Sequence, residues 1–151
     1  MNKTILLARP HPFVAPVMRP FLEEAGYAVS ISDGKSDLSA ETTDSGGAII
    51  SIAVVSSVGE SAETVFGELR RTSPSLPVAF AGLLEFEKAR PALERVGEEF
   101  DVAIKPLGVI PGSETNPGLG RPETLVYLSK SDLDDPTKRK LAIRLLRRHF
   151  R

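Results

Sequence analysis

Three side chains that could bind an anion follow apolar runs of the sequence: Arg9, His11 and Lys105. Arg9 and His11 come directly after the aliphatic run that ends at Ala8, and Lys105 comes directly after Asp101–Ile104. A guanidinium or an ammonium group binds phosphate or carboxylate by charge and hydrogen bonding. His11 could titrate near neutral pH, but no carboxylate or hydroxyl nucleophile stands at a recognisable spacing, so we do not expect catalysis. Lys105 also has a structural interpretation, since a Lys-Pro bond can fix the loop after a strand.

Short apolar runs alternate with longer segments of helical period, which predicts strands alternating with helices. The predicted strands are Lys3–Ala8, Tyr27–Ser32, Ala48–Val55, Leu76–Ala81 and Asp101–Ile104. The predicted helices are Phe13–Ala25, Glu60–Thr72 and Leu84–Val96. Pro16 and Pro20 predict a late or irregular start of the first helix, and Pro91 interrupts the third, because proline removes a backbone hydrogen bond. This alternation predicts an α/β fold with a parallel sheet, in which functional side chains gather at the carboxyl ends of the strands.

Residues 107–130 depart from this rhythm. They are rich in glycine and proline and end in a strand-like run, TLVYL. This segment is too long for a bare connection, so we expect a functional flap, a disordered stretch or an added strand. An added strand could pair beside the fifth strand or with a neighbouring chain. The candidate partner interface is then Thr124, Leu125, Val126, Tyr127 and Leu128.

The composition is that of an ordinary soluble domain. The chain has 151 residues, no cysteine, 26% charged residues and a net charge of −1. These values predict one domain over residues 1–151, without disulfides or thiolate metal sites. No basic-then-apolar leader follows Met1 and no apolar run is long enough to span a membrane, so we expect a cytoplasmic protein without a membrane partner. No phosphate-cradling loop or cluster of metal ligands stands out, so we expect no cofactor and no metal.

The C-terminal helix, predicted at residues 136–151, is strongly basic. After Pro136 the chain has seven bases and no acid, whereas the other 136 residues have 12 bases and 20 acids. Asp135 is the predicted N-cap, with proline in the first helical position. In one interpretation an apolar stripe packs on the sheet and leaves the bases in water. In the other, Arg144 and Arg148 belong to a docking face for an acidic partner. No aromatic residues alternate with the bases, so we expect no nucleic-acid partner.

Three stretches resemble the receiver domains of bacterial response regulators. MRPFLEEAGYAVSISDG (residues 18–34) resembles their first helix and second strand. ELRRTSPSLPVAFAG (68–82) is similar to their passage from the third helix to the fourth strand, and DVAIKP (101–106) resembles their fifth strand. The resemblance covers residues 3–106, with 138–150 standing for the last helix. It implies a flavodoxin-like (CheY-like), doubly wound parallel sheet of five strands in the order 2-1-3-4-5.

Receiver domains use an acid pair after the first strand to bind Mg²⁺ and an aspartate at the end of the third strand to accept a phosphoryl group. They add a Thr or Ser after the fourth strand and a lysine after the fifth. In this chain the acid-pair positions fall on Arg9, Pro10 and His11. The first acid anywhere in the chain is Glu23, and no Asp or Glu occurs from Ser45 to Gly59.

The remaining positions of the set depart in the same way. The phosphoacceptor position falls near Val54, Val55 and Ser56, which carry no carboxylate. The Thr or Ser position falls on Gly82 or the residue before it, and Lys105 alone matches the set. A guanidinium in place of the acid pair would repel Mg²⁺, which carboxylates and waters normally hold. The chain therefore resembles the degenerate members called pseudo-receivers, and we expect neither Mg²⁺ binding nor an aspartyl phosphate.

These features lead to two functional hypotheses. The first is a stand-alone receiver-like domain in two-component signalling that is not an enzyme, acts by phosphorylation-independent contact with a protein partner and could form a homodimer. Receivers interact through their fourth helix, fifth strand and fifth helix, so an insertion at 107–130 would remodel that surface. The alternative is a flavodoxin-like domain that binds a small anionic ligand through Arg9 and Lys105, with His11 and Gly82 in the same pocket.

Overall fold

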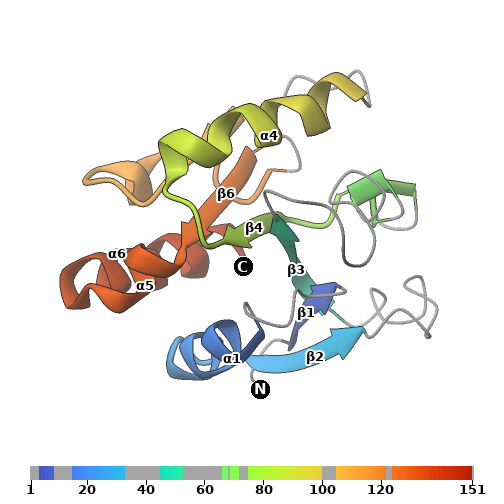
Figure 1. The fold of residues 1–151 in the computed structure, drawn as a ribbon. Helices are drawn as coiled ribbons and strands as arrows, with labels where there is room; N and C mark the ends of the chain where they lie inside the picture. Colours follow the sequence, from blue (N-terminus) through green and yellow to red (C-terminus); the bar gives the residue numbers. More distant parts are fainter. Residues whose placement is uncertain are drawn as a thin grey trace.

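The structure is a computed structural model that describes residues 4–8, 15–32, 45–52, 66–67, 69–71, 75–99, 105–121 and 124–150. These residues form one parallel sheet with helical segments on both faces (Figure 1). The strands are β1 (Thr4–Ala8), β2 (Ala28–Ser32), β3 (Ser45–Ile52), β4 (Val78–Gly82), β5 (Lys105–Leu107) and β6 (Thr124–Ser129). The helices are α1 (Ala15–Glu24), α4 (Phe86–Glu99), α5 (Lys130–Asp134) and α6 (Pro136–His149), with a 3-10 turn, η1, at Ser113–Thr115.

The six strands follow the order β2-β1-β3-β4-β6-β5, and every neighbouring pair is parallel. This arrangement confirms the predicted α/β, flavodoxin-like fold and the predicted extra strand. The extra strand β6 lies beside β5, as expected, but on its inner side, between β5 and β4. The five-stranded order is therefore interrupted, and the edge of the sheet is β5.

The residues of β6 explain its interior place. All six side chains of TLVYLS are buried. Leu125 and Tyr127 pack on one face of the sheet, and Val126 and Leu128 pack on the other. A strand that is apolar on both faces is stable only when both faces are covered. β5 has three residues, one of which is proline, and a proline is tolerated at a sheet edge because its missing N–H is not needed there.

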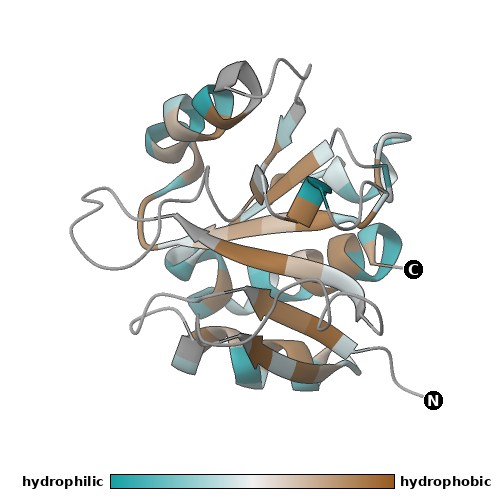
Figure 2. Ribbon diagram, turned by 90° about the vertical axis from the view of Figure 1, so that its right-hand side faces the viewer, coloured by the Kyte–Doolittle hydropathy of each residue, from teal (hydrophilic) through white to brown (hydrophobic). Residues whose placement is uncertain are grey.

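Two apolar cores lie on opposite faces of the sheet. One contains side chains of α1 and α6 together with Ile5 and Leu7, and the other contains side chains of α4 together with Leu6 and Phe80. Neighbouring residues of a strand point to opposite faces, which is why Leu6 leaves the core that Ile5 and Leu7 share. Figure 2 shows the hydrophobic colour concentrated along the strands. The sheet is thus the common wall of both cores.

The first helix contains two prolines, and residues 13 and 14 of the predicted helix lie outside the described residues. α1 begins at Ala15, so Pro16 falls in its first turn, where a missing N–H costs nothing, whereas Pro20 lies inside the helix. The helix stops before Gly26, whose φ of 97° is in the left-handed region that glycine adopts without strain. The turn brings Tyr27 to the start of β2. α4 likewise tolerates Pro91 in its interior.

Two adjacent caps organise the C-terminal helices. Ser129 Oγ accepts a hydrogen bond from the backbone N–H of Asp132 (3.1 Å), and Asp132 Oδ2 accepts one from the N–H of Ser129 (3.2 Å), which is a capping box. Asp135 then caps α6 by accepting from the N–H of Thr137, with Pro136 in the first turn. The predicted cap of α6 is confirmed, whereas the short helix α5 was not foreseen.

The end of α6 is fixed by hydrogen bonds from distant segments. His149 is fully buried; its Nε2 donates to the carbonyl of Val78 (2.9 Å) and its Nδ1 accepts from the N–H of Gly120 (3.0 Å). The hydroxyl of Tyr27 lies 3.1 Å from the carbonyl oxygen of Phe150, to which it donates. These bonds connect α6 to β4, to the segment before β6 and to β2. The region that was expected to be a flap at 107–130 therefore contributes to the core, with Leu119 buried as well.

Several predicted elements fall wholly or partly outside the described residues. Of the predicted strand at 101–104 nothing is described, and the strand that follows starts at Lys105. Of the predicted helix at 60–72, residues 66–67 and 69–71 are described, and they are helical. None of the described helices is long and apolar enough to span a membrane.

Candidate functional site

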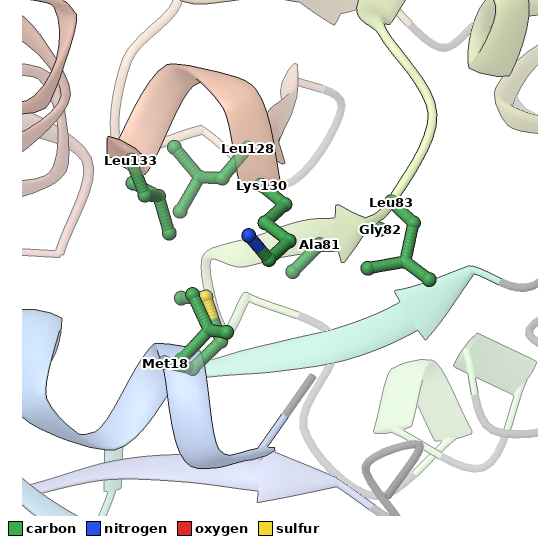
Figure 3. Close-up of a pocket in the computed structure, with 8 residues that line it drawn as sticks. Met18, Ala81, Gly82, Leu83, Leu128, Lys130 and Leu133 are labelled. Carbon is green, nitrogen blue, oxygen red and sulfur yellow. The ribbon is translucent and has the colours of Figure 1, made fainter. Parts of the chain in front are cut away.

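A small hollow lies at the carboxyl ends of β4 and β6, the sheet edge at which function was expected. It is an open depression between α1, β4 and α5, and its roughly 200 Å³ of empty space includes open solvent. Its described lining residues are Val17, Met18, Ala81, Gly82, Leu83, Leu128, Lys130 and Leu133. Figure 3 shows Met18 rising from α1 on one side and Leu83 closing the other, with the amino group of Lys130 pointing into the space between them.

Lys130 is placed by the strand before it and the helix that it begins. Ser129, the last residue of β6, pairs with Gly82 of β4, so Lys130 emerges directly beside the end of β4. The capping box on Ser129 fixes the turn into α5. Lys130 Nζ donates to Asp134 Oδ2 at 2.7 Å, one turn along α5. About half of each side chain is exposed, so this ion pair stabilises the helix by only a few tenths of a kcal/mol, roughly 0.3–0.5.

The buried Tyr127 of β6 forms a hydrogen bond with the loop that follows β4. The hydroxyl of Tyr127 donates to the carbonyl of Leu84 at 2.6 Å, which connects β6 to the loop after β4. Burial, with a smaller contribution from the carboxylate of Asp132, raises the pKa of Tyr127 above its usual range. The hydroxyl therefore stays protonated and keeps its role as a donor. The ring packs against Phe86 at the start of α4, with centroids 6.2 Å apart.

The hollow is lined by apolar residues and glycine, and Lys130 is the one charged residue among its described lining residues. Among its described lining residues there is no acid, and among all described residues no group of three His, Cys, Asp or Glu could hold a metal ion. Mg²⁺ requires oxygen ligands, usually carboxylates, so the described lining residues of the hollow do not fit it. An ammonium above apolar side chains suits a single negative charge instead, such as a carboxylate or a phosphate oxygen.

Only some of the residues that were predicted for this site lie among the described residues. Gly82 lines the hollow. Arg9 and His11 lie outside the described residues, although β1, which precedes them, ends at Ala8. The expected phosphoacceptor position, near residues 54–56, also lies outside the described part of the chain.

The structure places Lys105 away from the hollow, so its expected convergence with Gly82 is wrong. Lys105 begins β5 and pairs with Thr124, the first residue of β6, whereas Gly82 pairs with Ser129, the last. Five residues of strand separate these two levels, which is about 16 Å along the sheet. The backbone of Lys105 therefore lies toward the amino ends of the strands. The peptide bond between Lys105 and Pro106 is trans.

Lys130 is the residue that sequence reasoning missed. A weak signal was present, because TLVYLS is a strongly apolar run that a lysine follows directly, as in a strand that ends at a functional edge. The preceding run, DVAIKP, offers a similar pattern, and the two cannot be ranked by local sequence. Only the pairing of β6 with β4 shows that Lys130 follows a strand end beside the carboxyl end of β4.

The predicted partner interface is wrong for one set of residues and remains a prediction for another. Thr124, Leu125, Val126, Tyr127 and Leu128 are buried in an interior strand with a neighbour on each side, so they offer no free edge to a partner chain. Arg144 and Arg148 are exposed on the outer face of α6.

No protein-family model matches this chain, and no curated protein sequence matches it. Several solved structures are similar to it. A response regulator receiver protein from Sinorhizobium medicae WSM419 is 13% identical with a TM-score of 0.52, over 97% of this chain and 93% of that chain. A receiver domain protein from Clostridium thermocellum is 13% identical with a TM-score of 0.54, over 97% and 94%. The response regulator TrrA from Thermotoga maritima, in complex with Mg²⁺ and BeF, is 14% identical with a TM-score of 0.51, over 95% and 99%.

This chain has the fold of receiver domains. At such low identities the likeness concerns the arrangement of strands and helices alone. The likeness extends over nearly the whole length of each structure.

Proposed function

We propose that this chain is a receiver-like signalling domain that acts by contact with a protein partner and does not depend on phosphorylation. The receiver fold supports the first half of this proposal. The observation that carries the second half is an absence of carboxylates in the sequence: residues 9–11 are Arg-Pro-His, and no acid occurs from Ser45 to Gly59.

Charge explains why this absence matters. Transfer of a phosphoryl group to a carboxylate brings two negatively charged groups together, and a divalent cation is needed to offset their repulsion. The hollow at the end of β4 and β6 offers one ammonium, Lys130, which already has Asp134 as a partner. Neither an acceptor carboxylate nor a set of Mg²⁺ ligands is present among its described residues. The fold would then serve as a fixed surface rather than as a phosphorylation switch.

The test is chemical phosphorylation of the purified chain. The protein is incubated with acetyl phosphate and Mg²⁺ and then measured by intact mass spectrometry, beside a receiver domain that is known to be phosphorylated as a positive control. The expected result is a mass gain for the control only. A stoichiometric gain of one phosphoryl group on this chain, labile to hydroxylamine as acyl phosphates are, would refute the proposal.

A second candidate function is the binding of a small anion at the hollow. The position of Lys130 favours it, with the ammonium directed into an apolar cup. In this version Lys130 takes the place that was assigned to Lys105, while Arg9 remains a candidate because β1 precedes it. Melting of the chain in phosphate and in chloride at equal ionic strength tests this function. A phosphate-dependent rise of the melting temperature is expected, and it should be lost in Lys130→Gln.

The surface around the inserted segment is also part of the proposal. β5 forms the edge beside β6, α4 and α6 lie on the two faces there, and η1 packs near α6. We infer that the segment from residue 107 to 130 changes the surface through which receivers meet partners, because it inserts the buried strand β6 between β4 and β5, and β5 at the edge contains a proline. Such an edge resists pairing with another strand. A homodimer that is joined through β5, detected by cross-linking at engineered cysteines, would contradict this inference.

A further inference from the structure

The outer face of α6 carries a stripe of four bases. Lys140, Arg144, Arg147 and Arg148, called here the basic stripe, are all exposed. At 100° per residue they lie within an arc of about 100°, and they extend over about 12 Å of the helix. The opposite side of α6 is buried against the sheet, and His149 and Phe150 fix its end. The stripe is therefore presented at a fixed angle by a well-anchored helix.

The described acids at the end of α1 and before α6 already have other partners. Glu24 pairs with Arg139 at 2.6 Å, and Glu23 pairs with Arg19 at 3.6 Å. The acids before α6 are also engaged: Asp134 binds Lys130, while Asp132 and Asp135 cap helices.

Two bases of the stripe, Lys140 and Arg144, keep their hydrogen-bonding capacity for another molecule. Arg147 donates through Nε to the carbonyl of Ala25 at 3.2 Å. Neither Lys140 nor Arg144 has an ion pair with any residue that the structure describes. A guanidinium binds a carboxylate with two parallel hydrogen bonds, which is a specific as well as a strong contact. The stripe can therefore receive carboxylates from another molecule.

We propose that the basic stripe of α6 binds an acidic surface of a partner protein. This inference rests on the proposed function, because it names the surface through which the domain meets its partner. The charge of the rest of the chain favours a compact acidic patch over a nucleic acid. Outside the last 15 residues the chain has 12 bases and 20 acids, and an extended polyanion would reach beyond the stripe to those acids. Four bases over about 12 Å match a few carboxylates on one helix or loop.

The test is a titration of the ¹⁵N-labelled full chain with an oligoglutamate peptide, followed by NMR and by fluorescence anisotropy. Shifts of backbone amides should cluster on α6. The double reversal Lys140→Glu/Arg144→Glu should weaken binding at least about tenfold, since close charge pairs become repulsive. The matched control is Lys88→Glu/Arg95→Glu, which makes the same change of net charge at exposed positions of α4, on the other face of the sheet. This control should weaken binding by less than about twofold.

Equal weakening by the two double variants would overturn the proposal, because the binding would then follow net charge and not the stripe. Tighter binding of a DNA duplex or of phosphatidylserine vesicles than of the peptide, at equal charge concentration, would overturn it in favour of those partners. Thermal melts establish that the variants fold, and Lys140→Gln/Arg144→Gln replaces the reversal if that variant does not. The acetyl phosphate experiment is independent of these results: a phosphorylated chain would refute the proposed function, whereas an inactive stripe would refute only this inference.

Discussion

The buried histidine of α6 should make the stability of the domain depend on pH. His149 has no solvent-exposed surface, donates through Nε2 to Val78 and accepts through Nδ1 from Gly120. This pattern requires the neutral ring, since a protonated Nδ1 could not accept the N–H of Gly120. Burial lowers the pKa of His149 from 6.5 to about 4; the hydrogen bond to Val78 opposes this shift and the charge of Arg70 adds to it.

The sign and size of the effect follow from linkage. The folded pKa lies below the unfolded one, so His149 contributes full stability above pH 6.5, and this contribution is lost as the pH falls toward 4. At pH 5 the unfolded ring is almost fully protonated and the folded ring is mostly neutral. With pKa values of 6.5 and about 4, the free energy of unfolding at pH 5 is about 2 kcal/mol lower than at pH 8.

The assay is urea unfolding followed by circular dichroism at several pH values between 5 and 8. The chain has two histidines, so His11→Gln is the matched control for His149→Gln. We expect the loss of about 2 kcal/mol in the wild type and in the His11 variant, and a much flatter pH profile in His149→Gln, whatever its absolute stability. NMR titration of the ring protons gives a second readout on the unaltered chain. A ring of His149 that titrates near pH 6.5, or equal pH profiles in the two variants, would refute the reasoning.

Three further substitutions test the packing that holds the sheet and the C-terminal helices. A Cβ atom at Gly47 would overlap the ring of Phe150, so Gly47→Ala should destabilise the chain by about 1–3 kcal/mol in urea unfolding, and an added Phe150→Leu should recover part of that loss. Tyr27→Phe leaves the carbonyl of Phe150 without its donor and should cost about 1 kcal/mol; an unchanged unfolding midpoint would show that the bond contributes nothing. Ser129→Ala removes the side-chain cap shared with Asp132 and should lower the free energy of unfolding by about 1 kcal/mol, with Ser129→Asn as the variant expected to retain stability.

Much of the fold could be predicted because its signals are local. The apolar run of β3 specifies a strand that is covered on both faces, and Asp135-Pro136 specifies the start of α6 whatever lies around it. Each of these features depends on residues that are neighbours in the chain, so the sequence pattern contains the necessary information.

The candidate site could be predicted only in part, because it depends on which strands are neighbours. DVAIKP and TLVYLSK are both apolar runs with a lysine at or near the end, and nothing within either run states which one pairs with β4. TLVYLS, which buries six side chains, takes the interior position, and β5, whose described residues Lys105–Leu107 include a proline, lies at the edge. That choice places Lys130, rather than Lys105, beside the carboxyl end of β4.

The sequence by itself determined the charges: a basic last helix, an arginine and a histidine after the first strand, and no acid from Ser45 to Gly59. Only the tertiary structure decided where several of those charges lie, with Lys130 over an apolar hollow and Lys140 and Arg144 on an exposed helix face. The physical reason is that hydrophobic periodicity specifies which side chains are buried, whereas the competition among strands and helices for the same core selects their neighbours.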